Sequence, residues 1–212
     1  MNASVLRAIH AWDRARFRRF QRRWRHALTL TGEISPHLRF ARLRVEPGGR
    51  LETAAGFATE RQLGNHLWIG EDARIELGPR AWLRTEYGAN RITAFAGAHV
   101  HIGRDALING AMIHAKSDIS IGDECRLAFG SRILDADLHA LDSQTPERIE
   151  PVKIGDRVWL GADAMVLRGV TIGDDVVVGA GAVVTRDLPS RCLALGQPAR
   201  PVRDIAPRTD CS

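Results

Sequence analysis

A six-residue repeat in the second half of the chain constrains its fold most strongly. From residue 154 to residue 189 the chain divides into six consecutive hexads, each opened by an aliphatic residue, and Gly follows that residue in four of the six. This period matches neither an α-helix nor a half-buried strand. It is the period of a solenoid in which three short strands form one triangular coil. The opening aliphatic residue would point inward, and Gly would serve where a side chain is crowded or φ must be positive.

The same phase occurs earlier in the chain, which sets the expected extent of the solenoid. Hexads open at Ile69, Ile75, Ile102, Ile108 and Ile121, with a blurred stretch over 81–98. Short strands from about residue 38 are expected to form irregular capping coils. We therefore expect a β-helix over 37–203 and a C-terminal tail over 204–212, frayed from residue 206.

One segment inside the solenoid breaks the rhythm. Residues 140–151 fit no hexad, and the repeat resumes at Ile154. This segment is expected to loop out of the coil. Loops that leave a rigid scaffold often carry function.

The N-terminal segment, residues 1–36, differs from the rest in charge. Residues 1–30 hold eight Arg and one Asp, a balance of +7 within a formal total of +5, which leaves −2 for the remainder. Apolar residues recur at three- and four-residue steps, which predicts a basic amphipathic helix over 4–28. Its apolar stripe could contact an anionic membrane surface, or pack on the solenoid end or a neighbouring subunit. Because the basic charge is confined to this segment, nucleic acid is not the expected partner.

The cysteines and the lack of long apolar runs indicate in which compartment the protein is expected. The cysteines at positions 125, 192 and 211 show no metal-ligand spacing, so free thiols in a reducing cytoplasm are expected. Cys125 occupies a hexad position that takes a small inward side chain, so it is interpreted as core. No apolar run approaches a membrane span, and no signal peptide pattern opens the chain. We expect a protein of the cytoplasm, either free or peripheral at the inner face of the cytoplasmic membrane.

Acidic residues surround a histidine where the repeat stops. Asp135, Asp137, His139 and Asp142 lie at the entrance of the loop. A histidine titrates near neutrality, and a neighbouring carboxylate can fix its tautomer and raise its basicity. Asp137 and Asp142 are both candidates for that carboxylate, and Asp135 could instead hold the turn. The pattern predicts a general base at His139.

These motifs carry a family resemblance. The Asp-x-Asp-x-His stretch, the loop and the following Pro-Val-x-Ile-Gly-Asp-x-Val-Trp-Leu-Gly-Ala resemble the hexapeptide-repeat acyltransferases. The closest likeness is to the sugar O-acetyltransferases of the maltose, galactoside and nodulation group. The resemblance implies a left-handed parallel β-helix, a homotrimer, acetyl-CoA as co-substrate and no metal. It also implies that His139 activates a sugar hydroxyl for direct attack on the thioester, with no acyl-enzyme.

The resemblance assigns further positions one at a time. Asn109 matches an Asn that holds the acceptor sugar, and Trp159 matches a Trp beside acceptor and pantetheine. Ala162 matches a position whose backbone N–H meets the developing oxyanion. The remaining matches line the CoA: Gly161, Gly179, Ala180, Thr185 and Arg186 along the pantetheine arm, and Arg200 and Arg203 near the CoA phosphates.

The chain departs from this group at its N-terminus. The small helical domain typical of maltose acetyltransferases is absent, and the arginine-rich helix stands in its place. This departure favours a surface glycan or its lipid-linked precursor as acceptor over a free disaccharide.

Three other functions use a similar repeat or segment. A γ-class carbonic anhydrase-like metalloenzyme would use His99, His101 and His114, although Asn109 stands where one expected ligand would be. A non-catalytic β-solenoid scaffold would need none of the site residues. An acyltransferase that takes an acidic acyl carrier protein as donor would use the basic helix.

Overall fold

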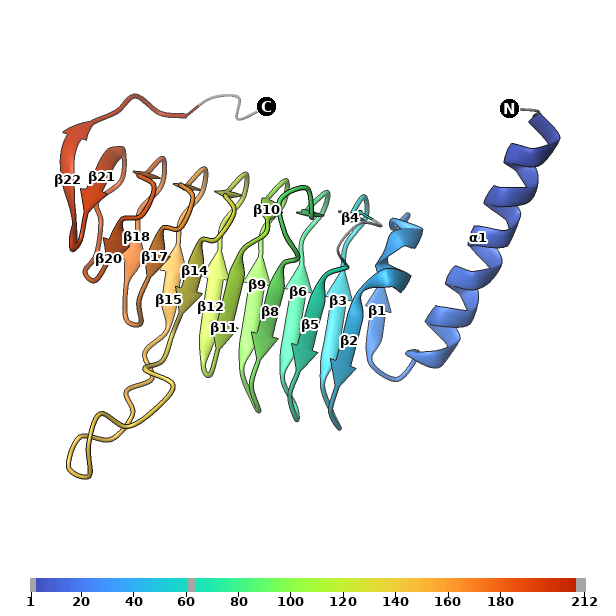
Figure 1. The fold of residues 1–212 in the computed structure, drawn as a ribbon, viewed down its shortest axis with the longest axis horizontal. Helices are drawn as coiled ribbons and strands as arrows, with labels where there is room; N and C mark the ends of the chain where they lie inside the picture. Colours follow the sequence, from blue (N-terminus) through green and yellow to red (C-terminus); the bar gives the residue numbers. More distant parts are fainter. Residues whose placement is uncertain (1–2, 61–63, 209–212) are drawn as a thin grey trace.

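The structure is a computed structural model that describes residues 3–60 and 64–208, with side chains from residue 11 onward. It is a parallel β-helix whose N-terminal end is flanked by the helix α1 (Ala3–Arg23) and a short 3-10 helix, η1 (Pro36–Phe40) (Figure 1). Each coil passes through three sheets in turn, so that the molecule is a three-sided prism.

The three sheets run along the prism, and the strands of each are named here in spatial order. The first sheet contains β1 (Leu28–Leu30), β3 (Arg50–Thr53), β6 (Arg74–Leu77), β9 (His99–Ile102), β12 (Asp118–Ile121), β15 (Val152–Ile154) and β18 (Thr171–Ile172). The second sheet contains β4 (Ala58–Thr59), β7 (Trp82–Arg84), β10 (Leu107–Asn109), β13 (Arg126–Leu127), β16 (Trp159–Leu160), β19 (Val177–Val178), β21 (Cys192–Gly196) and β22 (Ala199–Asp204). The third sheet contains β2 (Arg42–Val45), β5 (His66–Ile69), β8 (Arg91–Ala94), β11 (Met112–Ala115), β14 (Arg132–Leu134), β17 (Met165–Val166) and β20 (Val183–Val184).

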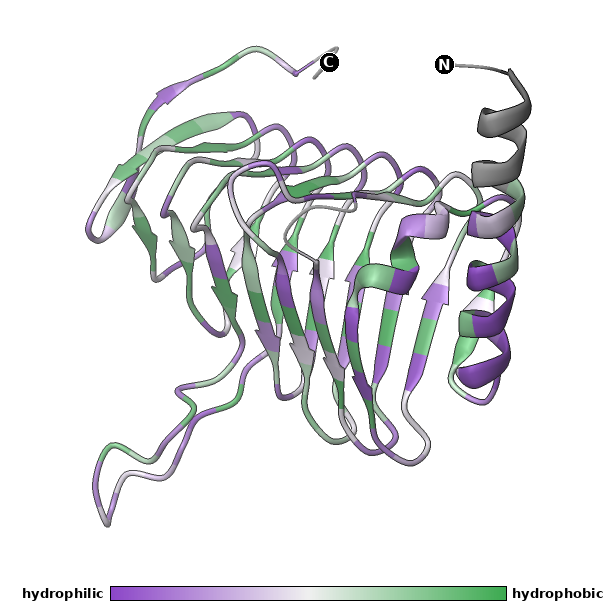
Figure 2. Cartoon of the chain, turned by 45° about the vertical axis from the view of Figure 1, so that its right-hand side comes forward, coloured by the Kyte–Doolittle hydropathy of each residue, from purple (hydrophilic) through white to green (hydrophobic). Residues whose placement is uncertain are grey.

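The core consists of columns of aliphatic side chains stacked coil upon coil. In the first sheet, parallel pairing aligns one such column, whose members are all fully buried: Leu51, Ile75, Val100, Ile119 and Val152. Burying one side chain of this size stabilises the fold by about 1.5–3 kcal/mol. Hydrophobic and hydrophilic residues alternate along the strands, as Figure 2 shows. The hexads therefore encode the core directly.

The glycines after the opening aliphatic residues are required by crowding. A Cβ on Gly103 would lie 2.6 Å from the carbonyl carbon of Gly122 in the next coil. The positive φ falls two positions later, as at Asp105 with φ 56°. Of the two reasons expected for these glycines, close approach between coils is the one that applies.

The N-terminal region has a shorter helix and an earlier first strand than the sequence predicts. Helix α1 ends at Arg23, so the expected helix over 4–28 is five residues too long at its C-terminal end. The reason is that Leu28–Leu30 pair in parallel with Leu51–Thr53 as β1 of the first sheet. Strands thus enter the sheets ten residues before residue 38.

Helix α1 packs its apolar side on the end of the coil. Phe17 and Phe20 contact the core, and their rings stack with centroids 6.1 Å apart. Packing on the solenoid, one of the two expected roles of this stripe, is therefore observed. No helix within residues 3–60 and 64–208 is long and apolar enough to cross a membrane.

Candidate active site

An aromatic cavity lies on the outer face of the second sheet. Parallel pairing places Leu107, Arg126 and Trp159 side by side on β10, β13 and β16. A cavity of about 370 Å³ lies over them, lined by Leu107, Asn109, Arg126, Leu127, Ala128, Trp159 and Arg208. The Trp159 residue remains 45% exposed. An exposed indole beside polar side chains suits a ligand with an apolar face, such as a sugar ring.

Asn109 supplies an unused hydrogen-bond acceptor to this cavity. Its buried side-chain oxygen has no hydrogen-bond partner among the described residues. Such groups are rare in native structures and call for an explanation. At the same corner of earlier coils, Asn90 Nδ2 donates to Asn65 Oδ1 at 2.8 Å, and Asn90 Oδ1 accepts from the Ala111 N–H. Asn109 lies outside this asparagine ladder, so its buried oxygen has no partner among the described residues at the base of the cavity.

Arg208 closes one side of the cavity and was missed by the sequence analysis. Its guanidinium carbon lies 5.8 Å from the centroid of the Trp159 ring. Its Nη1 donates to the Arg157 carbonyl at 2.7 Å, and its backbone N–H donates to Asp175 Oδ1 at 2.8 Å. The expectation of a frayed tail is therefore wrong for residues 206–208, while residues 209–212, including Cys211, lie outside the described range.

An ion pair fixes this C-terminal segment. Arg157 donates two hydrogen bonds to Asp175, at 2.7 and 3.0 Å. The Arg157 guanidinium, with further contributions from Arg208, holds the pKa of the Asp175 carboxyl below its ordinary value. Asp175 therefore stays ionised and anchors the segment that places Arg208 beside Trp159.

The predicted oxyanion position and three of the five predicted pantetheine positions lie on one corner of the prism. Ala162 and Ala180 are exposed at the turn between the second and third sheets, and the Ala162 carbonyl accepts from the Gly181 N–H at 2.8 Å. The Ala162 N–H donates to no described residue, so it is free to meet a ligand oxygen. A Cβ on Gly161 would lie 2.7 Å from the Ala180 nitrogen, and one on Gly179 would lie 2.2 Å from Leu195 Cδ2. Packing against backbone atoms of the next coil thus requires Gly161, whereas at Gly179 the exposed Leu195 side chain can move aside.

The loop that carries His139 leaves the prism at another corner. It begins after β14 of the third sheet and ends at β15 of the first, and Figure 1 shows it projecting from the coil. An antiparallel bridge between Ala136 and Ile149 closes its base. Leu138 has a φ of 67°, which is uncommon for a branched residue and costs about 1–3 kcal/mol. This turn sets the exposed His139 outside the coil.

The acidic residues around His139 bind other partners. Asp137 Oδ1 accepts from Arg168 Nε at 2.6 Å, and this contact lowers the Asp137 pKa. Asp142 Oδ1 accepts from the N–H groups of Gln144 and Thr145, which lower its pKa. Within the described residues, the structure shows no hydrogen bond or ion pair of His139. The carboxylate that orients His139 thus stays a prediction.

Asp135 holds the turn before the loop, which was the role that the sequence suggested for it. Its carboxylate is buried and accepts from the backbone N–H groups of Lys116 at 2.7 Å and Ser117 at 2.8 Å. Burial raises its pKa despite these hydrogen bonds. It fixes the chain just before the loop leaves the coil.

The predicted CoA residues near the C-terminus are exposed and spread over two elements. Thr185 and Arg186 follow β20, at the same corner of the prism as the His139 loop. Arg200 and Arg203 lie on β22, where Arg200 Nη1 donates to the Ala199 carbonyl at 2.8 Å. A single chain therefore presents two separated groups: His139 with Thr185 at one corner, and Asn109 with Trp159 on the second sheet.

The histidines of the alternative metal site and the Cys125 thiol lie in other parts of the fold. His99 and His101 lie on β9 and both contact Glu76, whereas His114 lies on β11 of the third sheet. Residues 3–60 and 64–208 contain no group of three or more ligand side chains that could hold a metal ion. Cys125 is fully buried, and burial raises its thiol pKa to about 12, which confirms its place in the core.

Comparison with known proteins supports the same fold and chemistry. A family model described as the hexapeptide repeat of succinyl-transferase matches residues 151–186. Nodulation protein L of Rhizobium meliloti (strain 1021) is 38% identical over 139 residues, which cover 64% of this chain and 73% of that protein. The galactoside O-acetyltransferase of Escherichia coli (strain K12) is 32% identical over 123 residues, 53% of this chain and 57% of that protein.

A solved structure agrees over most of the chain. The crystal structure of a polySia-specific acetyltransferase matches with a TM-score of 0.53 at 24% identity, covering 88% of this chain and 89% of that one. This match concerns the fold alone, a left-handed parallel β-helix. The sequence relatives extend it to chemistry: the chain belongs to the hexapeptide-repeat acyltransferases, in the O-acetyltransferase group.

Proposed function

We propose that the protein transfers an acetyl group from acetyl-CoA to a sugar hydroxyl. The observation that carries this proposal is the unpartnered Asn109 oxygen beside the exposed Trp159 indole. The oxygen can accept a hydrogen bond from a sugar hydroxyl, while the indole can pack on the apolar face of the ring. The galactoside and polySia acetyltransferases among its relatives act on sugars by name, which supports a glycan acceptor.

His139 acts as general base in this reaction. Its imidazole takes the proton of the acceptor hydroxyl while the oxygen attacks the thioester carbonyl. The backbone N–H of Ala162 stabilises the tetrahedral oxyanion. The C–S bond then breaks, CoA leaves as a thiolate, and the imidazolium returns its proton to the sulfur. A covalent enzyme intermediate is unnecessary, and the buried Cys125 thiol is unsuited to form one.

The complete site requires a second copy of the chain. Within one chain His139 and Trp159 occupy different sides of the prism. In a homotrimer, the His139 loop of one subunit can reach the second-sheet cavity of its neighbour. Acetyl-CoA would then lie between coils, along Ala162, Ala180, Thr185 and Arg186, with Arg200 and Arg203 toward its phosphates.

The acceptor we propose is a surface glycan or its lipid-linked precursor. The cavity over Trp159 is open on the outer face of the second sheet, so a longer glycan can extend beyond the sugar held by Asn109. The arginine-rich helix at the N-terminal end of the prism agrees with an acceptor held at an anionic surface.

The test is acetyl-CoA turnover with a panel of sugars and nucleotide sugars. His139→Ala should lower kcat by about 10²–10⁴-fold, the contribution expected of a general base, and leave the KM for acetyl-CoA nearly unchanged. His26→Ala, which removes an exposed histidine beside α1, is the matched control and should keep full activity. Unchanged turnover in His139→Ala would remove the proposed mechanism.

A further inference from the structure

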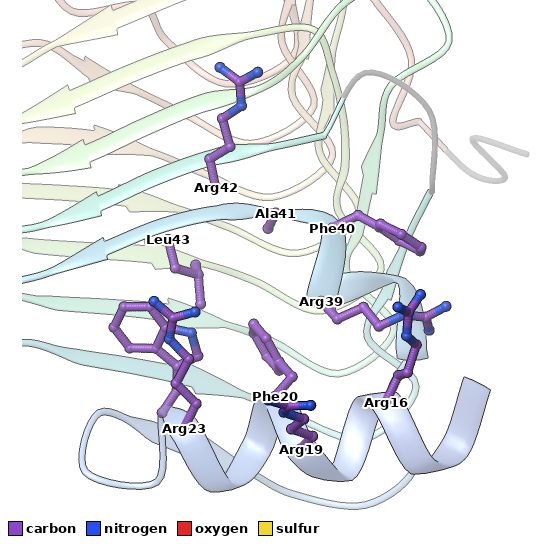
Figure 3. Close-up of a pocket in the computed structure, with 10 residues that line it drawn as sticks. Arg16, Arg19, Phe20, Arg23, Arg39, Phe40, Ala41, Arg42 and Leu43 are labelled. Carbon is purple, nitrogen blue, oxygen red and sulfur yellow. The ribbon is translucent and has the colours of Figure 1, made fainter. Parts of the chain in front are cut away.

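An arginine-lined cleft lies between α1 and the first coil, away from the candidate active site. It has a volume of about 690 Å³ and is lined by Arg16, Arg19, Phe20, Arg23, Trp24, Arg39, Phe40, Ala41, Arg42 and Leu43. Figure 3 shows Arg16, Arg19 and Arg23 on α1 opposite Arg39 of η1, whereas Arg42 lines the cleft from β2 with its side chain directed away from the helix. Three stretches of chain thus contribute cations to one concave surface.

Most of this charge is uncompensated. Arg39 is nearly buried, with 8% of its side chain exposed; it pairs with Asp13 and donates to the Pro36 carbonyl at 3.0 Å. Asp13 is the only acidic residue among the first 32. Among the described residues, no ion pair involves the four other lining arginines: Arg16, Arg19, Arg23 and Arg42. Like charges gathered in a cleft attract anions.

The positive field extends along the third sheet. A neighbouring cavity shares Arg42 and adds Arg44 and Arg91. His66 lies beside them, and its pKa is lowered first by burial and then by Arg42 and Arg91. The α1 end of the prism is therefore the basic end of a molecule in which residues 31–212 sum to −2.

The cleft combines guanidinium groups with an apolar floor. Guanidinium groups match phosphate oxygens in geometry and charge, while Phe20, Phe40 and Leu43 offer apolar contact. Trp12 lies on the same helical row as Arg16, Arg19 and Arg23; it is 56% exposed, and the Arg16 guanidinium lies 4.0 Å from its ring. An exposed Trp beside phosphate-binding arginines is typical of a membrane interface.

The extent of the charge favours a surface over a small soluble ligand. The arginines outside the cleft, Arg14, Arg18, Arg22 and Arg25, are also exposed. With the cleft arginines they spread positive charge from residue 14 to the end of α1 and on to residue 25, over about 15 Å, which exceeds one small ligand. A bilayer offers headgroup phosphates over that whole length.

We propose that this cleft binds the phosphate of anionic phospholipid headgroups and docks the α1 end of the protein on the membrane. Arg16, Arg19 and Arg23 contact the phosphate from the helix, and Arg42 adds positive charge at the rim on β2. Trp12 sits at the headgroup level. This site is independent of acetyl transfer, so the two proposals can fail separately.

The test is cosedimentation of the full chain with vesicles of phosphatidylcholine, with and without phosphatidylglycerol. We expect binding only to the vesicles with phosphatidylglycerol. Replacing Arg16, Arg19 and Arg23 together by Gln should weaken binding about tenfold more than replacing Arg14, Arg18 and Arg22, which removes the same charge from the same helix. Both triple variants should keep their circular dichroism and acetyl transfer to a soluble sugar, which shows that they fold.

Two outcomes would overturn this proposal. Equal weakening in the two triple variants would mean general electrostatic attraction with no phosphate site in the cleft. Absence of vesicle binding by the unmodified chain, together with binding of inorganic pyrophosphate that the cleft substitutions abolish, would assign the cleft to a soluble phosphate ligand.

Discussion

Asn109 shows how function appears at the scale of one residue. Its position in the hexads is that of a corner asparagine, and two corner asparagines in earlier coils form a satisfied ladder. The two kinds of corner asparagine differ in register, since Asn109 pairs with Arg84 whereas Ala111 takes the place of Asn90 in the next coil, and the blurred repeat over 81–98 hides this difference in the sequence. The unpartnered oxygen does separate them, since an unmet acceptor costs stability unless a ligand uses it.

Replacing Asn109 should therefore separate stability from activity. In Asn109→Ala, no hydrogen bond to the side-chain oxygen is lost, so the free energy of unfolding should change by less than about 1 kcal/mol or increase. The kcat/KM for the sugar should fall at least about tenfold, as for one lost hydrogen bond to substrate. Thermal unfolding and turnover of one preparation measure both. A large loss of stability would identify Asn109 as a structural residue.

The Asp175 carboxylate provides a pH-dependent test of the Arg208 contact. Its pKa is lower in the folded state than its ordinary 3.8, so its stabilising contribution is present above that value and is lost as the pH falls through the folded pKa. Asp175→Asn should lower Tm at pH 7 by about 2–4 °C, since a partly screened ion pair contributes about 1 kcal/mol. The difference should shrink at acid pH. A Tm difference that is constant with pH would contradict the role of the ionised carboxylate.

At the scale of elements, the hexads predicted the coil but not its beginning or the attachment of the tail that follows it. The solenoid and the loop before Ile154 could be predicted because the six-residue period is visible among residues that are close in sequence. The first coils lack it, because β1 and β2 are held by pairing with β3 and β5, and such pairing leaves no local signal. The Arg208 contacts join residues 51 and 33 positions apart, so the tail appeared unattached in sequence.

The stacking of aliphatic columns gives a stability prediction for one strand. Ile172 is 1% exposed, pairs with Ile154 and forms a bridge with Leu188, whereas Thr171 on the same strand is exposed. Ile172→Ala should destabilise the protein by about 2–5 kcal/mol because it opens a cavity between coils. Thr171→Ala, the control, should stay within about 0.5 kcal/mol. Chemical denaturation measures both, and equal effects would contradict the inward assignment of the opening hexad position.

At the scale of the whole molecule, the candidate site is divided between surfaces that one chain keeps apart. The family resemblance assigned His139, Asn109 and Trp159 to one reaction. In a single chain, His139 lies at a different side of the prism from Asn109 and Trp159. In the trimer proposed above, each His139 loop would meet the next subunit's Trp159 face through a single repeated contact. Docking of the basic α1 end on a membrane is the second proposal, and it does not depend on that contact.

The most direct test of this account is acetyl transfer by mixed trimers of His139→Ala and Trp159→Ala chains. Each variant alone should be nearly inactive. Coexpressed in equal amounts, they should regain about a quarter of the activity of the unmodified protein. In random assembly, about a quarter of the sites between subunits combine an intact His139 with an intact Trp159. If the mixture remained as inactive as either variant alone, while size measurements showed mixed trimers, His139 and Trp159 would not act together across the subunit interface.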